Sequence, residues 1–127
     1  MVWPSLPVGL LVSAILVINE VPDYEADREA RKANLIVRNG PLAGVKLHRW
    51  LMYVTYGLVA LFPLVGRMPW GALIALVTLP AARRALTLAR THAADPVRII
   101  PANAGTVMLH TVIGLLITCS YLVRLPR

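Results

Sequence analysis

Charged residues are scarce in this chain, and carboxylates are scarcer still. Charged residues make up 15 % of the 127 positions, with six acidic against 13 basic side chains, whereas soluble domains carry roughly 25 %. The single cysteine, Cys119, excludes an internal disulfide. The sequence also lacks a Cys/His metal framework, a phosphate-cradling glycine loop and a His-Glu-x-x-His motif. These absences exclude the common kinds of zinc site and nucleotide-binding site.

Apolar residues dominate instead, at 57 % of the chain with a mean hydropathy of +0.66. A transmembrane helix needs about 20 mostly apolar residues, and four segments approach that length: 2–19, 50–66, 68–82 and 104–123. The first segment lacks a preceding basic region and a following Ala-x-Ala site, so we interpret it as a retained span rather than a signal peptide. We therefore predict an all-α integral membrane bundle of about four transmembrane helices, in one membrane domain covering residues 1–127.

Basic residues indicate how such a bundle would be oriented. The segments 20–49 and 83–103 would lie on one side of the membrane and hold 10 of the 13 basic residues, whereas the other side holds Arg67, Arg124 and Arg127. Because cytoplasmic loops carry the Lys/Arg excess, we expect the loop 20–49 to face the cytoplasm. The basic residues are dispersed at span ends, without a nucleic-acid motif, so attraction to the lipid bilayer explains the net charge of +7 better than a nucleic-acid partner.

The carboxylates are concentrated in one stretch, "INEVPDYEADREARKANL", residues 18–35. It holds five of the six acidic residues of the chain. Asn19, Asp23 and Asp27 are four residues apart, a spacing that places side chains on one face of a helix. Pro22 can kink or break that helix, although a break would still leave the carboxylates near one another.

Two interpretations of this stretch follow from spacing alone. In the first, it is a salt-bridged helix end, with Asp27 reaching Arg31 and Glu25 reaching Arg28. In the second, Asp23 and Asp27 supply carboxylates to Mg²⁺, which favours oxygen ligands and substrate phosphates. The nearby arginines and lysine suit a multiply charged phosphate in that case. A polyisoprenoid diphosphate, with its head in water and its tail in lipid, would match such a site.

The longer pattern "NEVPDYEADREARKANLIVRNG", residues 19–40, resembles the second aspartate-rich motif of the UbiA superfamily of membrane prenyltransferases. The resemblance is closest to the branch that includes 1,4-dihydroxy-2-naphthoate prenyltransferase. The pattern runs Asn, Asp and Asp at intervals of four, then a basic stretch, then Leu-x-Val-Arg. The residues that match it are Asn19, Asp23, Asp27, Arg28, Lys32, Leu35, Val37 and Arg38.

The resemblance implies a reaction and a set of roles. Mg²⁺ would be held by Asp23 and Asp27, which are the expected metal ligands and catalytic residues. The diphosphate of a polyprenyl donor would be bound by the remaining motif residues, Asn19, Arg28, Lys32 and Arg38. The prenyl group would then pass to an aromatic acceptor, as in the biosynthesis of quinones and related lipids.

Two departures from the family pattern bear on that expectation. The family usually has glycine where Arg31 stands. The first aspartate-rich motif is also absent, and Asp95 is the only acidic residue outside the 18–35 stretch. We therefore expect the C-terminal half of a prenyltransferase, inactive alone. It would be a fragment of a longer chain, one subunit of a split enzyme whose partner is a second chain carrying the first motif, or a degenerate remnant.

A non-enzymatic function is the alternative prediction. In that case the chain is a four-span membrane protein whose acidic helix end binds a divalent cation or a partner. A small transporter subunit is less consistent with the sequence, because none of the predicted spans carries an acidic residue in its middle.

Overall fold

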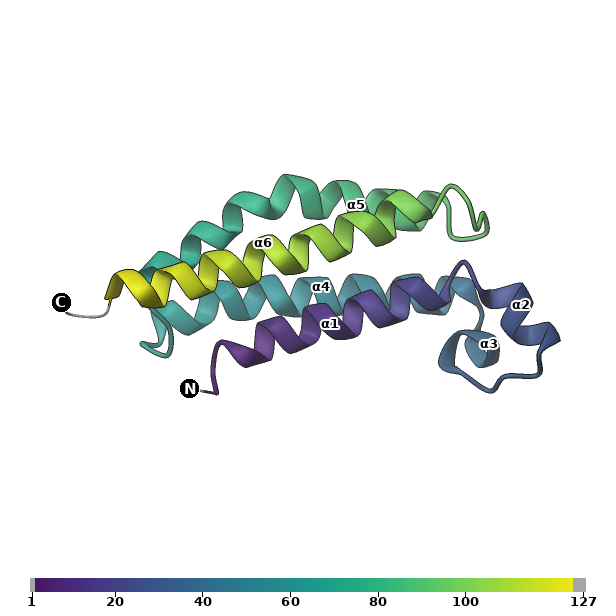
Figure 1. Ribbon diagram of the computed structural model, residues 1–127, viewed down its shortest axis with the longest axis horizontal. Helices are drawn as coiled ribbons and strands as arrows, with labels where there is room; N and C mark the ends of the chain where they lie inside the picture. The colour runs from purple at the N-terminus through teal and green to yellow at the C-terminus, as the bar shows by residue number, and fades with distance from the viewer. Residues whose placement is uncertain (1, 125–127) are drawn as a thin grey trace.

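The computed structural model describes residues 2–124, which form an elongated antiparallel bundle of long helical rods (Figure 1). The rods are α1 (Ser5–Glu20), α4 (Pro41–Leu64), the 3₁₀ helix η1 (Trp70–Thr78) continued by α5 (Leu79–Thr91), and α6 (Ile100–Arg124). Two short helices, α2 (Tyr24–Glu29) and α3 (Leu35–Asn39), connect α1 to α4. Within residues 2–124 there is no strand, so the all-α prediction is confirmed.

The two connections that hold most of the charge lie at the same end of the bundle. The helices α2 and α3 occupy this end together with residues 92–99, which link α5 to α6 (Figure 1). The start of α1, the end of α6 and the turn between α4 and η1 lie at the opposite end. We call the first of these the motif end. The fold thus brings the segments 20–40 and 92–99 to one end of the bundle.

Proline and glycine residues set several helix boundaries. The helix α1 ends at Glu20, two residues before Pro22, as the lost backbone donor of proline predicts. The helix α4 follows Gly40, whose φ of +85° suits glycine, and has Pro41 in its first turn. Pro80 lies in the first turn of α5, where the nine-residue 3₁₀ helix changes to α. A 3₁₀ run of that length is uncommon.

Two helices extend beyond the apolar segments that were predicted as spans. The third apolar segment was expected to end at residue 82, but α5 continues to Thr91, and Arg83, Arg84 and Arg90 therefore lie on a helix rather than in a loop. Similarly, α4 begins at Pro41 instead of residue 50. Arginine and lysine are good helix formers, so a helix can continue well beyond its apolar part. The apolar pattern had marked only that part.

Membrane crossing is supported for two rods. The segments Trp70–Thr91 and Ile100–Val123 are long and apolar enough to cross a bilayer, whereas the apolar helix α1 is shorter. The helix α4 carries Lys46, His48 and Arg49 in its first half. Large apolar side chains such as Trp50 and Leu115 are also exposed on the outside of the bundle. These features support membrane association, while four spans remain a prediction; residue 1 and residues 125–127 of the predicted domain, Arg127 included, lie outside the described residues.

A separate apolar cluster holds the motif end together. Its buried members come from every connection that meets there: Ile18, Val21, Ile36, Val45, Ala89, Ala93, Ile99 and Ala102. Ile36 of α3 lies so close to Gly44 of α4 that a Cβ at Gly44 would overlap the Ile36 Cδ1. The absence of a side chain at Gly44 therefore lets α3 dock on α4.

Candidate functional site

The carboxylate of Asp27 is the centre of the motif end. Asp27 lies on α2, and its side chain is largely buried. Its Oδ1 accepts a hydrogen bond from the Lys32 Nζ at 2.6 Å, and its Oδ2 accepts one from the Asn34 Nδ2 at 2.8 Å. Hydrogen bonds to an ionised group are the stronger kind. Each oxygen of the Asp27 carboxylate therefore accepts a hydrogen bond, and the two donors fix the orientation of the carboxylate.

Asn34 connects this carboxylate to the next helix. Its side-chain Oδ1 accepts a hydrogen bond from the backbone N–H of Val37 at 2.8 Å and so caps α3. The same amide group thus holds Asp27 with its nitrogen and α3 with its oxygen. The sequence analysis did not assign Asn34 to the site. An asparagine directly before the apolar residues that open a short helix is an N-cap signal, and that signal could have identified it.

The turn after α2 brings Lys32 back to Asp27. Arg31 adopts a left-handed backbone conformation, with φ of +54°, and the Lys32 backbone N–H donates to the Asp27 carbonyl oxygen at 3.0 Å. Glycine adopts this conformation with the least cost. Position 31 is where the resembling family usually has glycine, so the chain keeps a glycine-like backbone with an arginine side chain.

Asp23 and Asn19 do not form the continuous helical stripe with Asp27 that their spacing suggested. The helix breaks between Val21 and Asp23, so Asn19 lies on the last turn of α1 and Asp23 precedes α2. Both side chains are exposed. The helix is instead broken near Pro22, which was predicted to kink or break it.

Negative charge nevertheless gathers around Lys32. The hydrogen bond that Lys32 donates to Asp27 and the charge of Asp27 are the main causes that raise the pKa of Lys32, and the charges of Asp23 and Glu20 add to the effect. Asp23 and Asp27 therefore act on the same ammonium group. Asp27 is the direct partner of this cation, and Asp23 contributes through its charge alone.

The remaining basic residues of the motif are exposed around this centre. Arg28 forms a surface ion pair with Glu25 at 3.7 Å, as predicted. The predicted pair of Asp27 with Arg31 is wrong, because the left-handed turn presents Lys32 to Asp27 instead. Arg38 lies in the last turn of α3 and is exposed. In the part of the chain that the structure describes, no ion pair involves Arg38.

The oxygen donors at this end suit a hard cation chemically but form only part of a coordination shell. Across residues 2–124, no group of three or more His, Cys, Asp or Glu side chains is placed to hold a metal ion. Mg²⁺ is commonly bound by one or two carboxylates together with substrate phosphates and water. Asp23 is exposed and available, whereas Asp27 would have to exchange its Lys32 partner for the metal.

Asp95, the acidic residue outside the motif stretch, has a local structural role. Its Oδ1 accepts hydrogen bonds from the backbone N–H groups of Val97 and Arg98 at 3.0 and 2.9 Å, and its Oδ2 lies 3.5 Å from the Arg98 Nε. These bonds order the turn before α6. The hydrogen bond from Arg98 is the main reason that the pKa of Asp95 lies below its usual value.

Comparison with known proteins supports the relation that the motif indicates. The chain is 32 % identical over 108 residues to 1,4-dihydroxy-2-naphthoate octaprenyltransferase of Escherichia coli (strain K12), and the match covers 84 % of this chain and 34 % of that protein. The chain thus spans about a third of the length of this relative. No protein-family model and no solved structure matches the chain. The similarity supports a relation to UbiA-type prenyltransferases.

Proposed function

We propose that this chain forms the part of a membrane prenyltransferase that carries its second aspartate-rich motif, in the branch that includes 1,4-dihydroxy-2-naphthoate prenyltransferase. The whole enzyme would transfer a polyprenyl group from its diphosphate to an aromatic acceptor in quinone or related lipid biosynthesis. The main support is the similarity to an octaprenyltransferase. The gathering of Asp23, Asp27 and Lys32 at one end of a bundle with apolar outer surfaces is consistent with it.

In this proposal Asp23 and Asp27 hold Mg²⁺, and basic residues of the motif bind the diphosphate of the donor. Bound Mg²⁺ would neutralise charge on the leaving diphosphate. Asp23 is exposed without a hydrogen bond from the described residues and is free to accept the cation. The Lys32 side chain would rotate from Asp27 toward the diphosphate. The diphosphate carries more negative charge than one carboxylate and therefore attracts the ammonium group more strongly.

The other polar residues of the motif would complete the head-group site. Arg28 on α2 and Arg38 on α3 are exposed, and guanidinium groups match phosphate oxygens in geometry. Asn19 lies on the final turn of α1, at the motif end, and offers a neutral oxygen. We assign these three residues to donor binding.

The transfer itself requires a bond to break and a bond to form. The allylic C–O bond would break with its electron pair leaving on the diphosphate, and the cation-like carbon would be attacked by the electron-rich ring, which then loses a proton. Stabilising the leaving charge is the contribution expected of this chain. A second set of carboxylates, supplied by another chain or by further sequence, would complete the metal site, so we expect little transfer by these 127 residues alone.

Binding of a prenyl diphosphate tests the proposal without requiring the complete enzyme. The chain would be placed in phosphatidylcholine nanodiscs and titrated with farnesyl diphosphate, with and without Mg²⁺. We expect Mg²⁺-dependent binding that weakens by roughly tenfold or more in Asp23→Asn and in Asp27→Asn, the scale on which metal sites respond to lost ligands or their supports. Asp95→Asn is the matched control, because Asp95 also lies at the motif end but is bonded within its own turn.

The results also separate the proposal from a non-enzymatic cation site. A cation-binding helix end would bind Mg²⁺ with the same affinity in the presence and in the absence of the prenyl diphosphate. Unchanged farnesyl diphosphate binding in both aspartate variants would contradict the prenyltransferase proposal.

A further inference from the structure

A second concentration of charge lies on the side of the bundle, between α4 and α5. A groove of about 530 Å³ separates these helices at their motif-end halves. Its walls carry three arginines, one aromatic ring, one apolar side chain and two threonines: Arg49, Tyr53, Arg83, Leu86, Thr87, Arg90 and Thr91. We refer to this feature as the arginine groove.

Helix periodicity explains how the arginines come to share one groove. Arg49 and Tyr53 are four residues apart on α4, and Arg83, Thr87 and Arg90 are separated by four and three residues on α5. Residues at these spacings lie on one helix face. The two faces meet across the groove, so three arginines from distant parts of the sequence line it together.

These arginines have no counter-charge in the described chain. The ion pairs within residues 2–124 involve Arg28, Lys32 and Arg98, but not the three arginines of the groove. The acidic residues are all at the motif end or in the turn that links α5 to α6. Repulsion among three neighbouring cations is unfavourable unless an anion neutralises them. The groove is therefore complementary to an anion from outside the chain, and guanidinium groups favour phosphate.

The neighbouring aromatic residues favour a location of this anion at the membrane–water interface. The rings of Trp50 and Tyr53 pack edge to face with centroids 6.5 Å apart, and the two residues are 64 % and 56 % exposed. Exposed Trp and Tyr are typical of the membrane–water interface. The helix α5 also forms the last part of Trp70–Thr91, a segment able to cross a bilayer. The arginine groove thus has the exposed aromatic neighbours that are typical of a segment at the membrane–water interface.

We propose that the arginine groove binds an anionic phospholipid, with its phosphate on Arg49, Arg83 and Arg90 and the start of an acyl chain on Tyr53 and Leu86. Basic pockets between membrane helices bind anionic lipid head groups in this manner. The proposal depends on membrane association and does not depend on prenyl transfer. A soluble phosphate would use the arginines but would gain nothing from the apolar wall or the exposed aromatic pair.

A competition between lipids in native mass spectrometry tests this site. The full chain would be released from mixed micelles containing phosphatidylglycerol and phosphatidylcholine in equal amounts, and the bound lipid counted. We expect the wild type to retain phosphatidylglycerol selectively. Each of Arg49→Gln, Arg83→Gln and Arg90→Gln should weaken that retention by roughly fivefold, as about 1 kcal/mol per basic residue near an anionic membrane implies.

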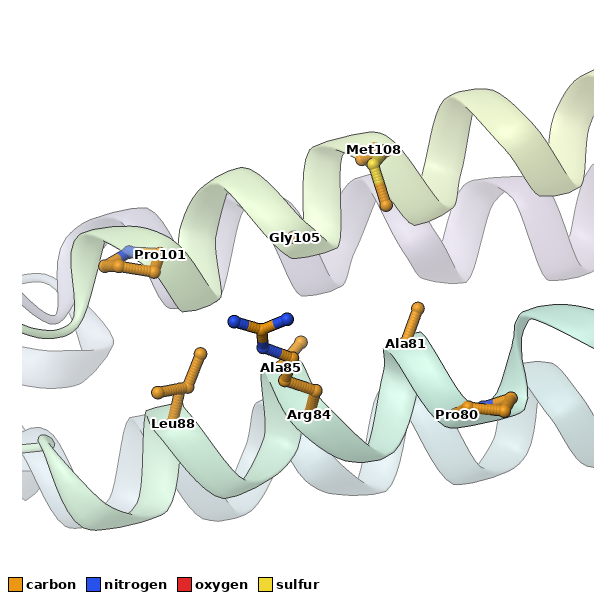
Figure 2. A pocket seen from close by; sticks show the side chains of 8 residues that line it. All are labelled: Pro80, Ala81, Arg84, Ala85, Leu88, Pro101, Gly105 and Met108. Atoms are coloured by element: carbon orange, nitrogen blue, oxygen red, sulfur yellow. The ribbon is translucent and has the colours of Figure 1, made fainter.

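Arg84→Gln supplies the matched control on the same helix. Arg84 follows Arg83 in the sequence, but its guanidinium projects into the space between α5 and α6 (Figure 2). That separate cavity of about 460 Å³ also includes Leu88 and Met108 in its wall. Removing this charge lowers the net charge of the protein by the same amount, without altering the arginine groove. We therefore expect Arg84→Gln to retain phosphatidylglycerol as the wild type does.

Three outcomes would overturn the proposal. In the first, the wild type shows no preference for phosphatidylglycerol. In the second, Arg84→Gln loses retention as much as the groove variants, which would indicate a response to overall charge. In the third, pyrophosphate or farnesyl diphosphate binds through these arginines in phosphatidylcholine micelles while phosphatidylglycerol does not compete, which would assign the groove to a soluble or prenyl diphosphate. Arg83→Lys, which keeps the charge, should retain more lipid than Arg83→Gln if the variants remain folded by circular dichroism.

Discussion

The Lys32 ammonium lies 2.6 Å from the Asp27 Oδ1 and thereby occupies the carboxylate that the resemblance assigns to a metal ion. Asn34 donates to the other oxygen of the same carboxylate. The side chain of Lys32 is far more exposed than that of Asp27, so the lysine can leave while the aspartate stays in place. This arrangement suggests an exchange in which Lys32 neutralises Asp27 until a diphosphate and a cation arrive together.

Lys32→Gln should change the affinities for Mg²⁺ and for the diphosphate in opposite directions. Without the ammonium, no cation among the described residues competes with Mg²⁺ for the Asp27 carboxylate, so we expect Mg²⁺ to bind more tightly in the absence of diphosphate. Farnesyl diphosphate should bind more weakly, because one of its cations is gone. Isothermal titration calorimetry in nanodiscs measures both affinities. Lys46→Gln, an exposed lysine on α4, is the control; a parallel fall of both affinities in Lys32→Gln would contradict the exchange.

Arg31→Gly should stabilise the chain. Arg31 has φ of +54°, and a side chain in the left-handed region costs roughly 1–2 kcal/mol. Part of that gain is offset by the greater freedom of glycine in the unfolded state, so we expect an increase of about 1 kcal/mol or less in the free energy of unfolding. Denaturation in mild detergent measures it. Ala30→Gly is the matched control, since Ala30 has φ of −73° and should lose stability; a loss of similar size at both positions would refute the strain at Arg31.

Gly44→Ala should loosen α3 from α4. A Cβ at position 44 would overlap the Cδ1 of Ile36 and lie 3.1 Å from the Cγ2 of Val21. Overpacking of this kind typically costs about 1–3 kcal/mol, and we expect a lower midpoint of thermal unfolding. Because Asn34 caps α3 and holds Asp27, faster amide hydrogen exchange in residues 34–39 should accompany the loss.

Two variants check this explanation of Gly44. Gly57→Ala lies on the same helix, where a Cβ would have no neighbour within 4 Å, and should be neutral or slightly stabilising because alanine is the better helix former. Ile36→Val removes the atom in conflict and should restore part of the stability of Gly44→Ala. Equal effects of alanine at positions 44 and 57 would show that the contact with Ile36 is not responsible.

Acid should release the turn before α6 through Asp95. The pKa of this carboxyl is held below the usual 3.8, chiefly by the hydrogen bond from the Arg98 backbone N–H. A depressed folded-state pKa gives stability that is present above pH 3.8 and is lost as the pH falls through the folded value. We expect the unfolding midpoints of the wild type and Asp95→Asn to differ at pH 5 and to converge at lower pH. A constant difference across that range would exclude titration of Asp95 as the cause.

Much of the fold followed from local sequence patterns. Apolar segments predicted four long helical regions, and the structure contains a rod for each of them. Pro22 marked the limit of α1 because proline acts on the backbone locally. The positions of Asp23 and Asp27 at the end of the first apolar segment were also readable, since the motif is contiguous in the chain.

The contacts between side chains could not be predicted from the sequence in this way. The Asp27–Lys32 pair depends on a left-handed turn at Arg31, and side-chain spacing on a regular helix had suggested Arg31 instead. His48 looks like a helix-end residue in sequence, yet it is fully buried and its Nε2 lies 3.0 Å from the Thr106 Oγ1 of α6. Such contacts depend on how one helix is rotated and shifted against another.

The sequence by itself determined the helical class of this protein, its apolar outer surface and the clustering of its carboxylates, because each is a property of residues close together in the chain. Only the tertiary structure decided that Lys32 and Asn34 share the Asp27 carboxylate, that Ile36 docks on Gly44, and that arginines of α4 and α5 line one groove. The contacts of Asp27 depend on the left-handed turn at Arg31, whereas the other two relationships arise because packed helices adopt one register among many with similar apolar patterns. The free energy of packing, rather than the period of the sequence, makes that choice.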